Sequence, residues 1–382
     1  MSIQRCFNIA DFRRLAKRRL PAPLFHYIDG GSDDEWSLRN NTCAFDKYAL
    51  LPEQLTDVSS VDPAISLFGA RCALPLMLAP TGMSRLFHHE KELGAARAAA
   101  RFGIPYALST LGTSSIEDIA QVPELTRIFQ IYILKDRELT REFVERARAG
   151  GYQALCLTVD MQMAGNRERD HRFGMTMPPR IGPGTLVDFA LHPHWVANFL
   201  RAPDFRLANV AHRVDALKGG AMSLIDYVNS QFDRAVSWDD MAWLAEAWNG
   251  PLIVKGILSA ADAQRACAAG ATALMISNHG GRQLEGAPAP VDCVSAIRAA
   301  VGPQVEVIVD GGVRRGVHVL KALALGANAV SFGRPYLYAL AAGGQAGVER
   351  MLTLMRAEIV RGLTLLGCAS VRDVAPHHLM RL

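Results

Sequence analysis

Residues 273–284 read ALMISNHGGRQL, an apolar run followed by a polar tip that contains two glycines. Such a run is typical of a strand that is buried on both faces, as in a parallel sheet. In the tip, His279 can move a proton near neutral pH and Arg282 can hold a carboxylate through two hydrogen bonds. Gly280 and Gly281 let the backbone pass close to a ligand. The stretch therefore predicts a buried strand that ends in a site for a small anionic substrate.

The same pattern recurs along the chain, and this repetition decides the predicted fold. Eight apolar runs begin near Leu74, Pro105, Arg127, Ala154, Leu252, Ala273, Val305 and Ala329. Most neighbouring starts are roughly 20 to 30 residues apart, which fits one strand and one helix per unit. Helices are predicted between the runs, for example at residues 91–102, 140–149, 260–269, 291–300 and 316–325, and several end at a glycine. Eight such units predict an α/β fold of the (β/α)8 barrel type, whereas a doubly wound sheet would not usually need eight similar units.

The interval between the fourth and the fifth run is much longer than the others. It predicts an insertion at residues 172–237, after the fourth strand of the barrel. We expect one domain over residues 1–382, with the following parts. These are an N-terminal helical extension at 1–73, the barrel at 74–171 and 238–340, and C-terminal helices at 341–382.

The composition excludes several classes of protein. The chain has 382 residues, half of them hydrophobic, and its 41 basic and 37 acidic residues leave a formal charge of +4. No long basic run with interleaved aromatic residues is present, so nucleic acid binding is not expected. The seven cysteines are scattered without metal-binding or redox spacing, which predicts reduced thiols in the cytoplasm. The N-terminal stretch is polar and amphipathic rather than a signal sequence, and no apolar run approaches the ~20 residues that span a bilayer.

Polar and charged residues stand at the ends of the apolar runs, where barrel enzymes build their active sites. The candidates at these tips are Thr81, Gly82, Ser109, Gln130, Tyr132, Thr158, Asp160, Lys255, His279, Asp310 and Arg334. Because the carboxyl ends of barrel strands meet on one face, we expect these residues to surround a single cavity.

Two tips predict a phosphate site. Residues 310–314 read DGGVR after the seventh run, and Gly333 and Arg334 follow the eighth. Barrels frequently bind phosphate at this place, through glycine amides and a helix N-terminus. Either tip alone is as readily an ordinary glycine turn with solvated arginines, but together they indicate a cofactor with one phosphate group, such as FMN. No GxGxxG fingerprint follows an early strand, so a nicotinamide site of the Rossmann type is not indicated.

Lys255 ends an apolar run, although lysine is rarely buried without a partner. Three roles remain open: a Schiff base, a positive charge beside a cofactor that becomes anionic, and a side chain that only reaches the rim of the barrel. The flavin interpretation suits Lys255 best, because reduced flavin gains negative charge.

His279 and Asp160 are candidates for a base and the carboxylate that orients it. A lone histidine is more often a hydrogen-bonded core residue, but the adjacent glycines and Arg282 favour catalysis. Arg167 would hold a substrate carboxylate together with Arg282, although its stretch GNRERD is equally compatible with a solvated loop. The histidines at 88–89 lack the spacing of a zinc helix, and those at 377–378 are expected to be exposed, so no catalytic metal is predicted.

The chain resembles the FMN-dependent 2-hydroxy-acid dehydrogenase and oxidase family, which includes glycolate oxidase, bacterial L-lactate dehydrogenase and (S)-mandelate dehydrogenase. The resemblance covers nearly the whole chain as an ordered series of short motifs. They are LFHYIDGG at 24–31, APTG at 79–82, FQIY at 129–132, LTVD at 157–160, VKG at 254–256, SNHGGRQL at 277–284, DGGVRRG at 310–316 and GR at 333–334.

The resemblance implies a role for individual residues. Those implied to bind the flavin ring are Thr81, Ser109, Gln130, Thr158, Lys255, the backbone at Pro80 and Gly82, and, as a further cofactor residue, Ser277. Those implied to bind the ribityl chain and phosphate of FMN are Asp310, Gly312, Arg314, Gly333 and Arg334. His279 is implied as the catalytic base with Asp160 as its support, and Tyr132 as the group that stabilises the transition state near the substrate hydroxyl. Arg167 and Arg282 are implied to clamp the substrate carboxylate, with Tyr27 as a further contact.

The implied reaction is the oxidation of an (S)-2-hydroxy acid, such as L-lactate or mandelate, to the 2-oxo acid. Electrons would pass from FMN to a quinone or another respiratory acceptor. Gly82 and Leu111 stand where glycolate oxidase has an alanine and a large aromatic residue, which makes room near the substrate side chain. Glycine at the first position also occurs in the branch of lactate and mandelate dehydrogenases, so the resemblance favours a dehydrogenase. The alternatives are an oxidase that produces hydrogen peroxide and a barrel that binds phosphate ligands without redox activity.

The predicted insertion contains a hydrophobic stretch at residues 186–200, LVDFALHPHWVANFL. It is too short and too interrupted to span a bilayer, but it could lie on a membrane surface. It resembles the corresponding segment of membrane-associated family members, which implies a peripheral protein on the inner face of the cytoplasmic membrane. The alternative is a lid whose aromatic residues pack on the barrel or on a neighbouring subunit. Family members are commonly tetramers, so a homo-oligomer is expected.

Overall fold

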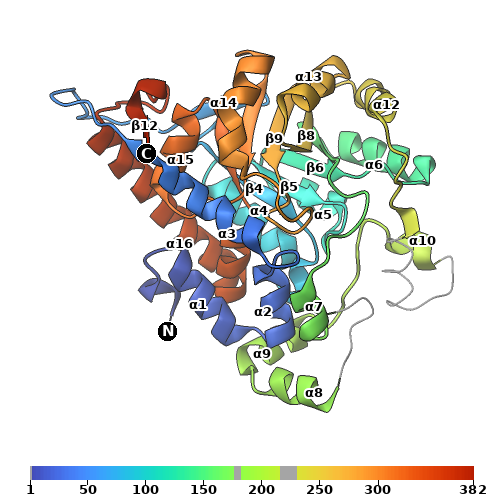
Figure 1. Ribbon diagram of the computed structural model, residues 1–382. Helices are drawn as coiled ribbons and strands as arrows, with labels where there is room; N and C mark the ends of the chain where they lie inside the picture. Colours follow the sequence, from blue (N-terminus) through green and yellow to red (C-terminus); the bar gives the residue numbers. More distant parts are fainter. Residues whose placement is uncertain (1, 176–181, 216–229) are drawn as a thin grey trace.

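Eight parallel strands close into a barrel at the centre of the protein (Figure 1). The computed structural model describes residues 2–175, 182–215 and 230–382. Each strand pairs with the next one along the chain, and the last pairs with the first. The barrel strands are β4 (Leu76–Thr81), β5 (Tyr106–Ser109), β6 (Arg127–Ile131), β7 (Ala154–Thr158), β8 (Leu252–Ile257), β9 (Ala273–Ser277), β10 (Glu306–Asp310) and β11 (Ala329–Phe332). The predicted (β/α)8 barrel is confirmed.

The strands are apolar along their whole length because each face is buried in a different core. In β9, Ala273 and Met275 belong to the cluster that fills the barrel, whereas Leu274 and Ile276 belong to the larger cluster outside it. Side chains alternate between the two faces of a strand, so both sets must be apolar when helices cover the outer face.

Helices surround the barrel between the strands. They are α4 (Lys91–Arg101), α5 (Ile116–Ala120), α6 (Arg137–Ala149), α12 (Trp238–Trp248), α13 (Ala260–Ala268), α14 (Pro290–Val301), α15 (Gly316–Ala324) and α16 (Arg334–Leu366). Short polar side chains start several of them: Ser237 accepts a hydrogen bond from the Asp240 amide in α12, and Asp240 returns one to the Ser237 amide. In the second of these bonds the Ser237 amide donates to the Asp240 carboxylate, so the capping box satisfies amides that have no partner inside the helix.

The N-terminal extension covers both ends of the barrel. Three helices, α1 (Ile9–Arg19), α2 (Ala22–Asp29) and α3 (Trp36–Cys43), lie beside α16 and the carboxyl ends of the strands. The hairpin of β2 (Ile65–Leu67) and β3 (Ala70–Cys72) lies at the opposite end, where Leu67 and Cys72 pack into the core of the barrel. This hairpin was not expected from the sequence.

The C-terminal part differs in two ways from the predicted helices at 341–382. Helix α16 already begins at Arg334, bends at Gly343 and Gly344, and continues to Leu366. The chain then ends in β12 (Leu379–Arg381), which pairs antiparallel with β1 (Tyr48–Leu50). The expected exposure of the histidines at 377–378 is wrong for His378, which is buried with Nε2 3.4 Å from Cys368 Sγ.

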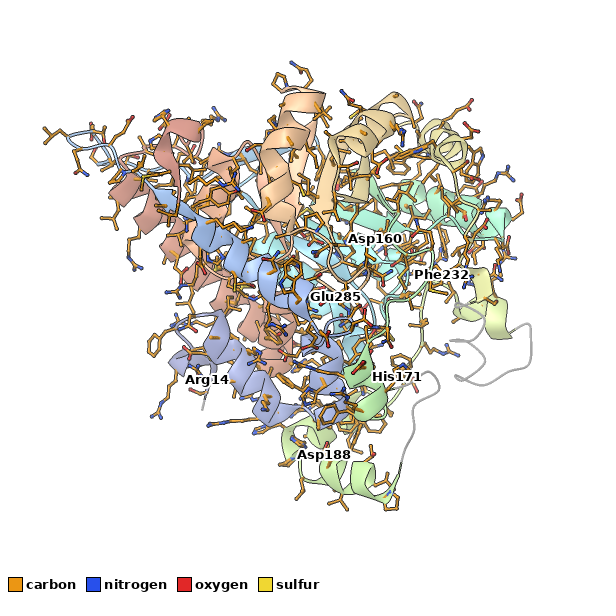
Figure 2. The ribbon with its side chains drawn as sticks, viewed as in Figure 1. Arg14, Asp160, His171, Asp188, Phe232 and Glu285 are labelled. Atoms are coloured by element: carbon orange, nitrogen blue, oxygen red, sulfur yellow. The ribbon has the colours of Figure 1, made fainter. Side chains whose placement is uncertain are left out.

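The described part of the insertion is helical. It contains α8 (Pro183–Ala190), α9 (Pro193–Arg201) and α10 (Ala211–Asp215), and it follows α7 (Glu168–Arg172). Residues 176–181 and 216–229 of the predicted insertion lie outside the described residues. Helices α8 and α9 lie below α2 and α7 in Figure 1, and Asp188 of α8, labelled in Figure 2, accepts a hydrogen bond from the Ala22 amide at 2.7 Å.

Candidate active site

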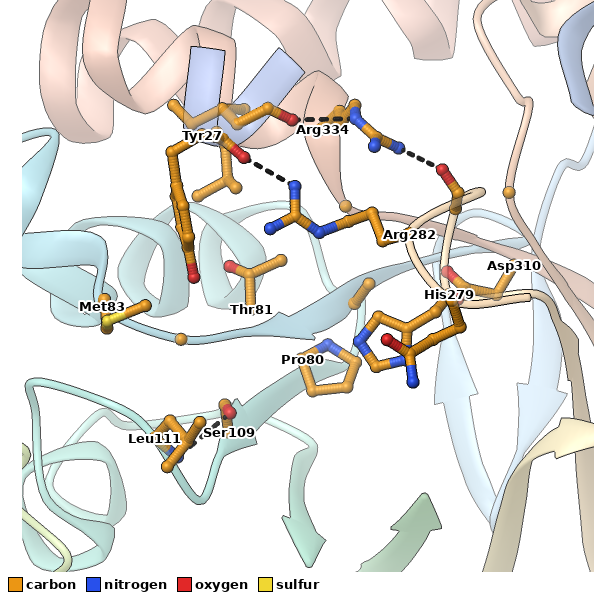
Figure 3. A pocket seen from close by; sticks show the side chains of 18 of the residues that line it. Tyr27, Pro80, Thr81, Met83, Ser109, Leu111, His279, Arg282, Asp310 and Arg334 are labelled. Atoms are coloured by element: carbon orange, nitrogen blue, oxygen red, sulfur yellow. Dashed lines mark hydrogen bonds between the residues drawn. The ribbon is translucent and has the colours of Figure 1, made fainter. Parts of the chain in front are cut away.

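A cavity of about 430 Å³ opens at the carboxyl ends of the strands (Figure 3). Fifteen of the predicted site residues line it. They are Tyr27, Pro80, Thr81, Gly82, Ser109, Tyr132, Arg167, Lys255, His279, Arg282, Asp310, Gly312, Arg314, Gly333 and Arg334. The remaining four predicted site residues do not line the cavity. Gln130, Asp160 and Ser277 each form a hydrogen bond with a residue that does, and Thr158 is the last residue of β7.

His279 lies in a tight turn that directs it toward Asp160. The backbone of His279, Gly280 and Gly281 is left-handed at three successive residues, with φ of 57°, 68° and 72°. A histidine adopts this conformation at a cost, which surrounding contacts must offset. The His279 amide donates to Ser277 Oγ at 3.0 Å, and the imidazole Nδ1 lies 2.9 Å from Asp160 Oδ1.

The Asp160 carboxylate is ionised, so it fixes the tautomer of the imidazole. Burial alone would raise the pKa of Asp160, but its contact with His279 and the charge of Lys255 outweigh burial and lower it. A carboxylate can only accept from Nδ1–H, which leaves Nε2 of His279 as the nitrogen with a free lone pair. Among the described residues Nε2 has no hydrogen-bond partner, so this arrangement can accept a proton from a ligand in the cavity.

Lys255 is a buried cation with a carboxylate partner. Its Nζ donates to Ser277 Oγ at 3.0 Å and lies 3.2 Å from Asp310 Oδ2, while Ser277 Oγ donates to the same oxygen at 2.7 Å. Burial would lower the pKa of Lys255, but Asp310 and Asp160 outweigh it and raise the pKa. A Schiff-base lysine needs a neutral amine, so this geometry favours a fixed positive charge. The Ser277 hydroxyl is bonded to Asp310 and stays outside the cavity lining.

Two buried polar groups near the barrel axis lack partners within the described residues. Gln130 accepts from Ser109 Oγ at 3.2 Å and from the Thr110 amide at 3.3 Å, but its Nε2 donates to nothing. Thr158 Oγ1 is equally without a partner. An unsatisfied buried polar group costs free energy, so such groups point to a ligand that completes them. A donor and a hydroxyl beside Lys255 fit the polar edge of a flavin ring.

The opposite part of the cavity suits a phosphate. Arg314 is partly buried, and its one side-chain hydrogen bond among the described residues goes to its neighbour's carbonyl, Val313 O, at 2.8 Å. Gly333 precedes the first residue of α16, so the amides at the start of a long helix face the same space. Arg334 differs, because its guanidinium already donates to three backbone carbonyls, those of Ile28, Gly30 and Gly280.

Glycine is required at position 312 for a reason that does not depend on a ligand. A Cβ at Gly312 would lie 1.8 Å from the carbonyl oxygen of Asn41 in α3, and its φ is 77°. The glycine is therefore required by the close approach of α3, whatever ligand its amide meets.

Two arginines and a tyrosine form a cationic wall. The guanidinium carbons of Arg282 and Arg167 lie 4.9 Å and 5.5 Å from the ring centroid of Tyr27. Burial and the neighbouring Arg167 lower the pKa of Arg282 to about 10. The nearby carboxyl of Asp170, 3.3 Å from Arg167 Nε, has a pKa that burial raises. Two cations thus lie beside a single carboxyl group, which leaves positive charge in excess and favours binding of a further anion.

The family model for FMN-dependent dehydrogenases matches residues 16–381. The chain belongs to the FMN-dependent dehydrogenase family. It is 40% identical over 376 residues to an L-lactate dehydrogenase of Pectobacterium atrosepticum, covering 97% of this chain and 96% of the relative. It is 42% identical over 372 residues to an L-lactate oxidase of Nostoc sp., covering 96% of each. A crystal structure of the monotopic membrane protein (S)-mandelate dehydrogenase superposes with a TM-score of 0.95 at 37% identity, covering 99% of this chain and 100% of that one.

Membership of the FMN-dependent dehydrogenase family confirms the predicted family, enzyme class and cofactor. FMN fits the residues present, because Gln130 Nε2 and Thr158 Oγ1 lack partners among the described residues, and Arg314, which lines the cavity, has no anionic partner among them. None of the helices in the described parts of the chain combines the length and apolar character that a membrane crossing requires.

Several residues of this FMN-dependent dehydrogenase line the cavity although the sequence did not predict them as site residues. Apolar ones come from the insertion and the loops before it, and they are Met161, Met175, Leu207 and Phe232. Phe232, labelled in Figure 2, meets the Tyr132 ring edge-on with centroids 5.1 Å apart. The stretches that contribute them have no motif, and only the fold of the insertion brings them to the cavity.

Gly82 and Leu111 were predicted to make room for the substrate side chain. Both line the cavity, but a Cβ at Gly82 would lie 2.9 Å from the carbonyl oxygen of Leu111. The glycine therefore also permits a close approach of two barrel loops.

The sequence also did not predict one set of side chains with the geometry to hold a metal ion. Among the described residues one set of ligand atoms gathers within reach of a metal ion, those of Glu53, His377 and His378. None of the three lines the cavity, and the absence of a catalytic metal stays a prediction.

Proposed function

We propose that this protein oxidises an (S)-2-hydroxy acid to the 2-oxo acid with FMN as its cofactor. The observation that carries the proposal is a single cavity in which the His279–Asp160 pair faces the cationic wall of Arg167 and Arg282. The first group suits removal of a proton, and the second suits a carboxylate. The similar proteins are named L-lactate dehydrogenase, L-lactate oxidase and (S)-mandelate dehydrogenase, whose named substrates are 2-hydroxy acids.

The residues of the chain divide the chemistry between them. Arg167 and Arg282 hold the substrate carboxylate, and both guanidinium groups lie close to the Tyr27 ring. This positions the substrate carbinol beside His279, whose Nε2 takes up a proton while Asp160 stabilises the resulting imidazolium. Tyr132 is proposed to bind the substrate hydroxyl. FMN, when bound, accepts the two electrons that the substrate loses.

The cofactor residues are proposed in two groups, following the two ends of the cavity. At the ring end they are Pro80, Thr81, Gly82, Ser109, Gln130, Thr158 and Lys255, with Ser277 holding Lys255. For the ribityl chain and the phosphate they are Asp310, Gly312, Arg314, Gly333 and Arg334, with Asp310 beside Lys255. Arg314 is the strongest of these assignments, because its guanidinium lines the cavity and lacks an anionic partner among the described residues.

Anaerobic mixing tests the proposed function. The purified, yellow protein is mixed without oxygen with glycolate, L-lactate, (S)-mandelate and longer 2-hydroxy acids, and the flavin absorbance is followed. We expect bleaching by at least one (S)-acid and none by its (R)-enantiomer. A protein that retains FMN and is bleached by none of these acids would overturn the proposal.

We propose a dehydrogenase that passes electrons to a quinone or another respiratory acceptor. The alternative, an oxidase, is supported by the L-lactate oxidase of Nostoc sp. at 42% identity. Oxygen consumption and quinone or dye reduction are compared after addition of the same acid. Dehydrogenase activity predicts rapid dye reduction with slow oxygen uptake, and the reverse result favours the oxidase.

We also propose that α8 and α9 bring the protein to the inner face of the cytoplasmic membrane. Leu186, Val187, Leu191 and Leu200 of this region are 60% to 72% exposed. A similar structure is that of a monotopic membrane protein. Trp195 is not part of the exposed set, because its Nε1 donates to Leu86 O at 2.8 Å on the barrel.

A homotetramer is proposed from the family resemblance. Light scattering of the purified protein tests this assembly, and a monomeric mass would exclude it.

A further inference from the structure

A carboxylate is buried at the end of α2, where a helix disfavours negative charge. Asp29 is the last residue of α2 and is 5% exposed. The carboxyl end of a helix carries partial negative charge, so an acid there needs compensation. Burial by itself would raise the pKa of Asp29, but Arg13, Tyr338 and Arg169 lower it to about 2.

The compensation comes from three different elements. Arg13 of α1 donates through Nε and Nη2 at 2.5 and 2.7 Å, which is a bidentate contact. Arg169 of α7 donates through Nη1 at 2.9 Å, and the Tyr338 hydroxyl of α16 donates at 2.8 Å. One side chain therefore ties α2 to α1, α7 and α16.

Three of the tied elements carry or adjoin residues of the cavity. Tyr27 lies two residues before Asp29 in α2, and Arg167 immediately precedes α7. Arg334 is the first residue of α16, one turn before Tyr338. Asp29 itself does not line the cavity, so it can only act through these elements.

The backbone at the end of α2 is held from the side of the cavity. Arg282 donates to Tyr27 O at 2.6 Å, and Arg334 donates to Ile28 O at 2.8 Å and to Gly30 O at 2.6 Å, as the dashed lines of Figure 3 indicate for Arg282. The next residue also lies close to the catalytic turn, because a Cβ at Gly31 would lie 2.7 Å from Gly281 O. The end of α2 is thus fixed by its side chain on one side and by its carbonyls on the other.

We propose that Asp29 is a positioning residue that holds the substrate-carboxylate end and the cofactor-phosphate end of the cavity in a fixed relation. Its bond to Arg169 acts on the substrate end, through α7 and Arg167. Its bond to Tyr338 acts on the phosphate end, through the start of α16. The substrate half of this inference rests on the proposed function, whereas the cofactor half does not.

Removal of the negative charge of Asp29 distinguishes a positioning role from a purely electrostatic one. Asp29 is an anion near two sites for anions, so a purely electrostatic role predicts tighter binding of substrate and FMN in Asp29→Asn. Positioning predicts the opposite, because the elements that present Tyr27, Arg167 and Arg334 lose their common anchor.

The holoenzyme carrying Asp29→Asn is compared with the wild type by rapid-mixing flavin reduction. We expect the apparent substrate Kd to rise about tenfold while the limiting rate of reduction changes less than about threefold, since misplaced binding groups affect binding more than the proton transfer. The Glu349→Gln variant serves as control, because it removes a carboxylate from an ion pair with the largely exposed Arg101. Unchanged substrate affinity with a lowered melting temperature would overturn the proposal, and so would tighter binding.

Two single-arm variants give a second test that remains informative if Asp29→Asn does not fold. Arg169→Gln is expected to weaken substrate binding with little change in FMN release, and Tyr338→Phe to speed FMN release with little change in substrate binding. FMN release is measured by fluorescence after dilution, with no substrate present. Equal effects of both variants on both ligands would contradict the separate roles of the Arg169 and Tyr338 bonds. If Tyr338→Phe speeds FMN release as expected but no acid bleaches the flavin, only the proposed function is contradicted.

Discussion

His279 depends on one oxygen of Asp160 for its orientation, with Nδ1 and Oδ1 2.9 Å apart. The imidazole lies on the carboxyl end of β9, whereas the residues that suit a phosphate lie after β10 and β11. Proton transfer and cofactor binding should therefore be separable by substitution.

We predict that His279→Gln retains FMN but loses flavin reduction. Glutamine cannot accept a proton at neutral pH, and loss of a general base typically slows a reaction about 100- to 10,000-fold. Anaerobic stopped-flow bleaching measures the rate, and the flavin-to-protein absorbance ratio measures retention. His377→Gln, at an exposed position outside the cavity, is the control. Near-normal reduction in His279→Gln would exclude this residue as the base.

Substitution of Arg314 should affect FMN affinity and the stability of the FMN-free protein differently. Loss of a charged hydrogen bond to a phosphate costs about 1.5–3 kcal/mol, so Arg314→Met should weaken FMN binding roughly 10- to 100-fold. The FMN-free protein should not lose stability, because a partly buried cation that has no anionic partner among the described residues is itself unfavourable. Arg315→Met is the control, since that side chain is half exposed and paired with Glu358.

Fluorescence titration of the FMN-free protein and urea unfolding measure these two quantities. A loss of stability equal to the loss of affinity would assign Arg314 a structural role.

At the scale of elements, local patterns predicted the barrel well. The predicted helix at 91–102 is α4 at Lys91–Arg101, and the predicted helix at 316–325 is α15 at Gly316–Ala324. Periodicity and cap residues are local, so they identify such elements with errors of one to three residues, the largest at α6, which begins at Arg137 rather than at residue 140. The glycine rule failed in one detail: after α6 the left-handed residue is Gly151, whereas Gly150 keeps a φ of −77°.

Elements that depend on distant partners could not be predicted in the same way. Strands β1 and β12 have three residues each and pair across almost the whole chain. The two strands of the β2–β3 hairpin also have three residues each, which is too short for their apolar alternation to identify them. Asp29 is missed for a similar reason, because its three partners come from α1, α7 and α16. By contrast, His279 and Asp160 end strands, and the ends of barrel strands are brought together by the fold itself.

Arg85 connects α9 to the loop that follows β4. Its guanidinium donates to Phe199 O at 3.0 Å and to Ala202 O, at the carboxyl end of α9, and lies 5.5 Å from the Phe199 ring centroid. Cations stabilise the carboxyl end of a helix, and this one is almost fully buried.

We predict that Arg85→Met loosens α9 without unfolding the barrel. Hydrogen bonds from a charged group contribute about 1.5–3 kcal/mol, which corresponds to roughly 10- to 100-fold faster amide exchange in α9. Hydrogen exchange with mass spectrometry measures this, and β9 provides an internal reference. Arg201→Met, at an exposed position in α9 itself, is the control. Unchanged exchange in α9 would show that Arg85 does not hold the helix.

At the scale of the whole molecule, the apolar surface of α8 and α9 faces away from the residues that bind it to the barrel. Trp195 and Asp188 contact Leu86 and Ala22, whereas Leu186, Leu191 and Leu200 are 61%, 72% and 71% exposed. The packing of Trp195 agrees with the interpretation of the insertion as a lid. The exposed leucines are the residues on which the proposed membrane contact depends.

We predict that replacement of Leu186, Leu191 and Leu200 by serine abolishes binding to vesicles of phosphatidylethanolamine and phosphatidylglycerol. Insertion of one leucine contributes up to about 2 kcal/mol, so loss of three should lower the partition coefficient by at least about tenfold. Co-sedimentation measures partitioning. The matched control replaces Leu55, Leu365 and Leu382, which are at least as exposed as Leu186 but lie outside the insertion. None of the three insertion leucines lines the cavity, so flavin reduction should be unchanged in the variant. Vesicle binding that falls equally in the control would mean that general surface hydrophobicity, rather than α8 and α9, brings the protein to lipid.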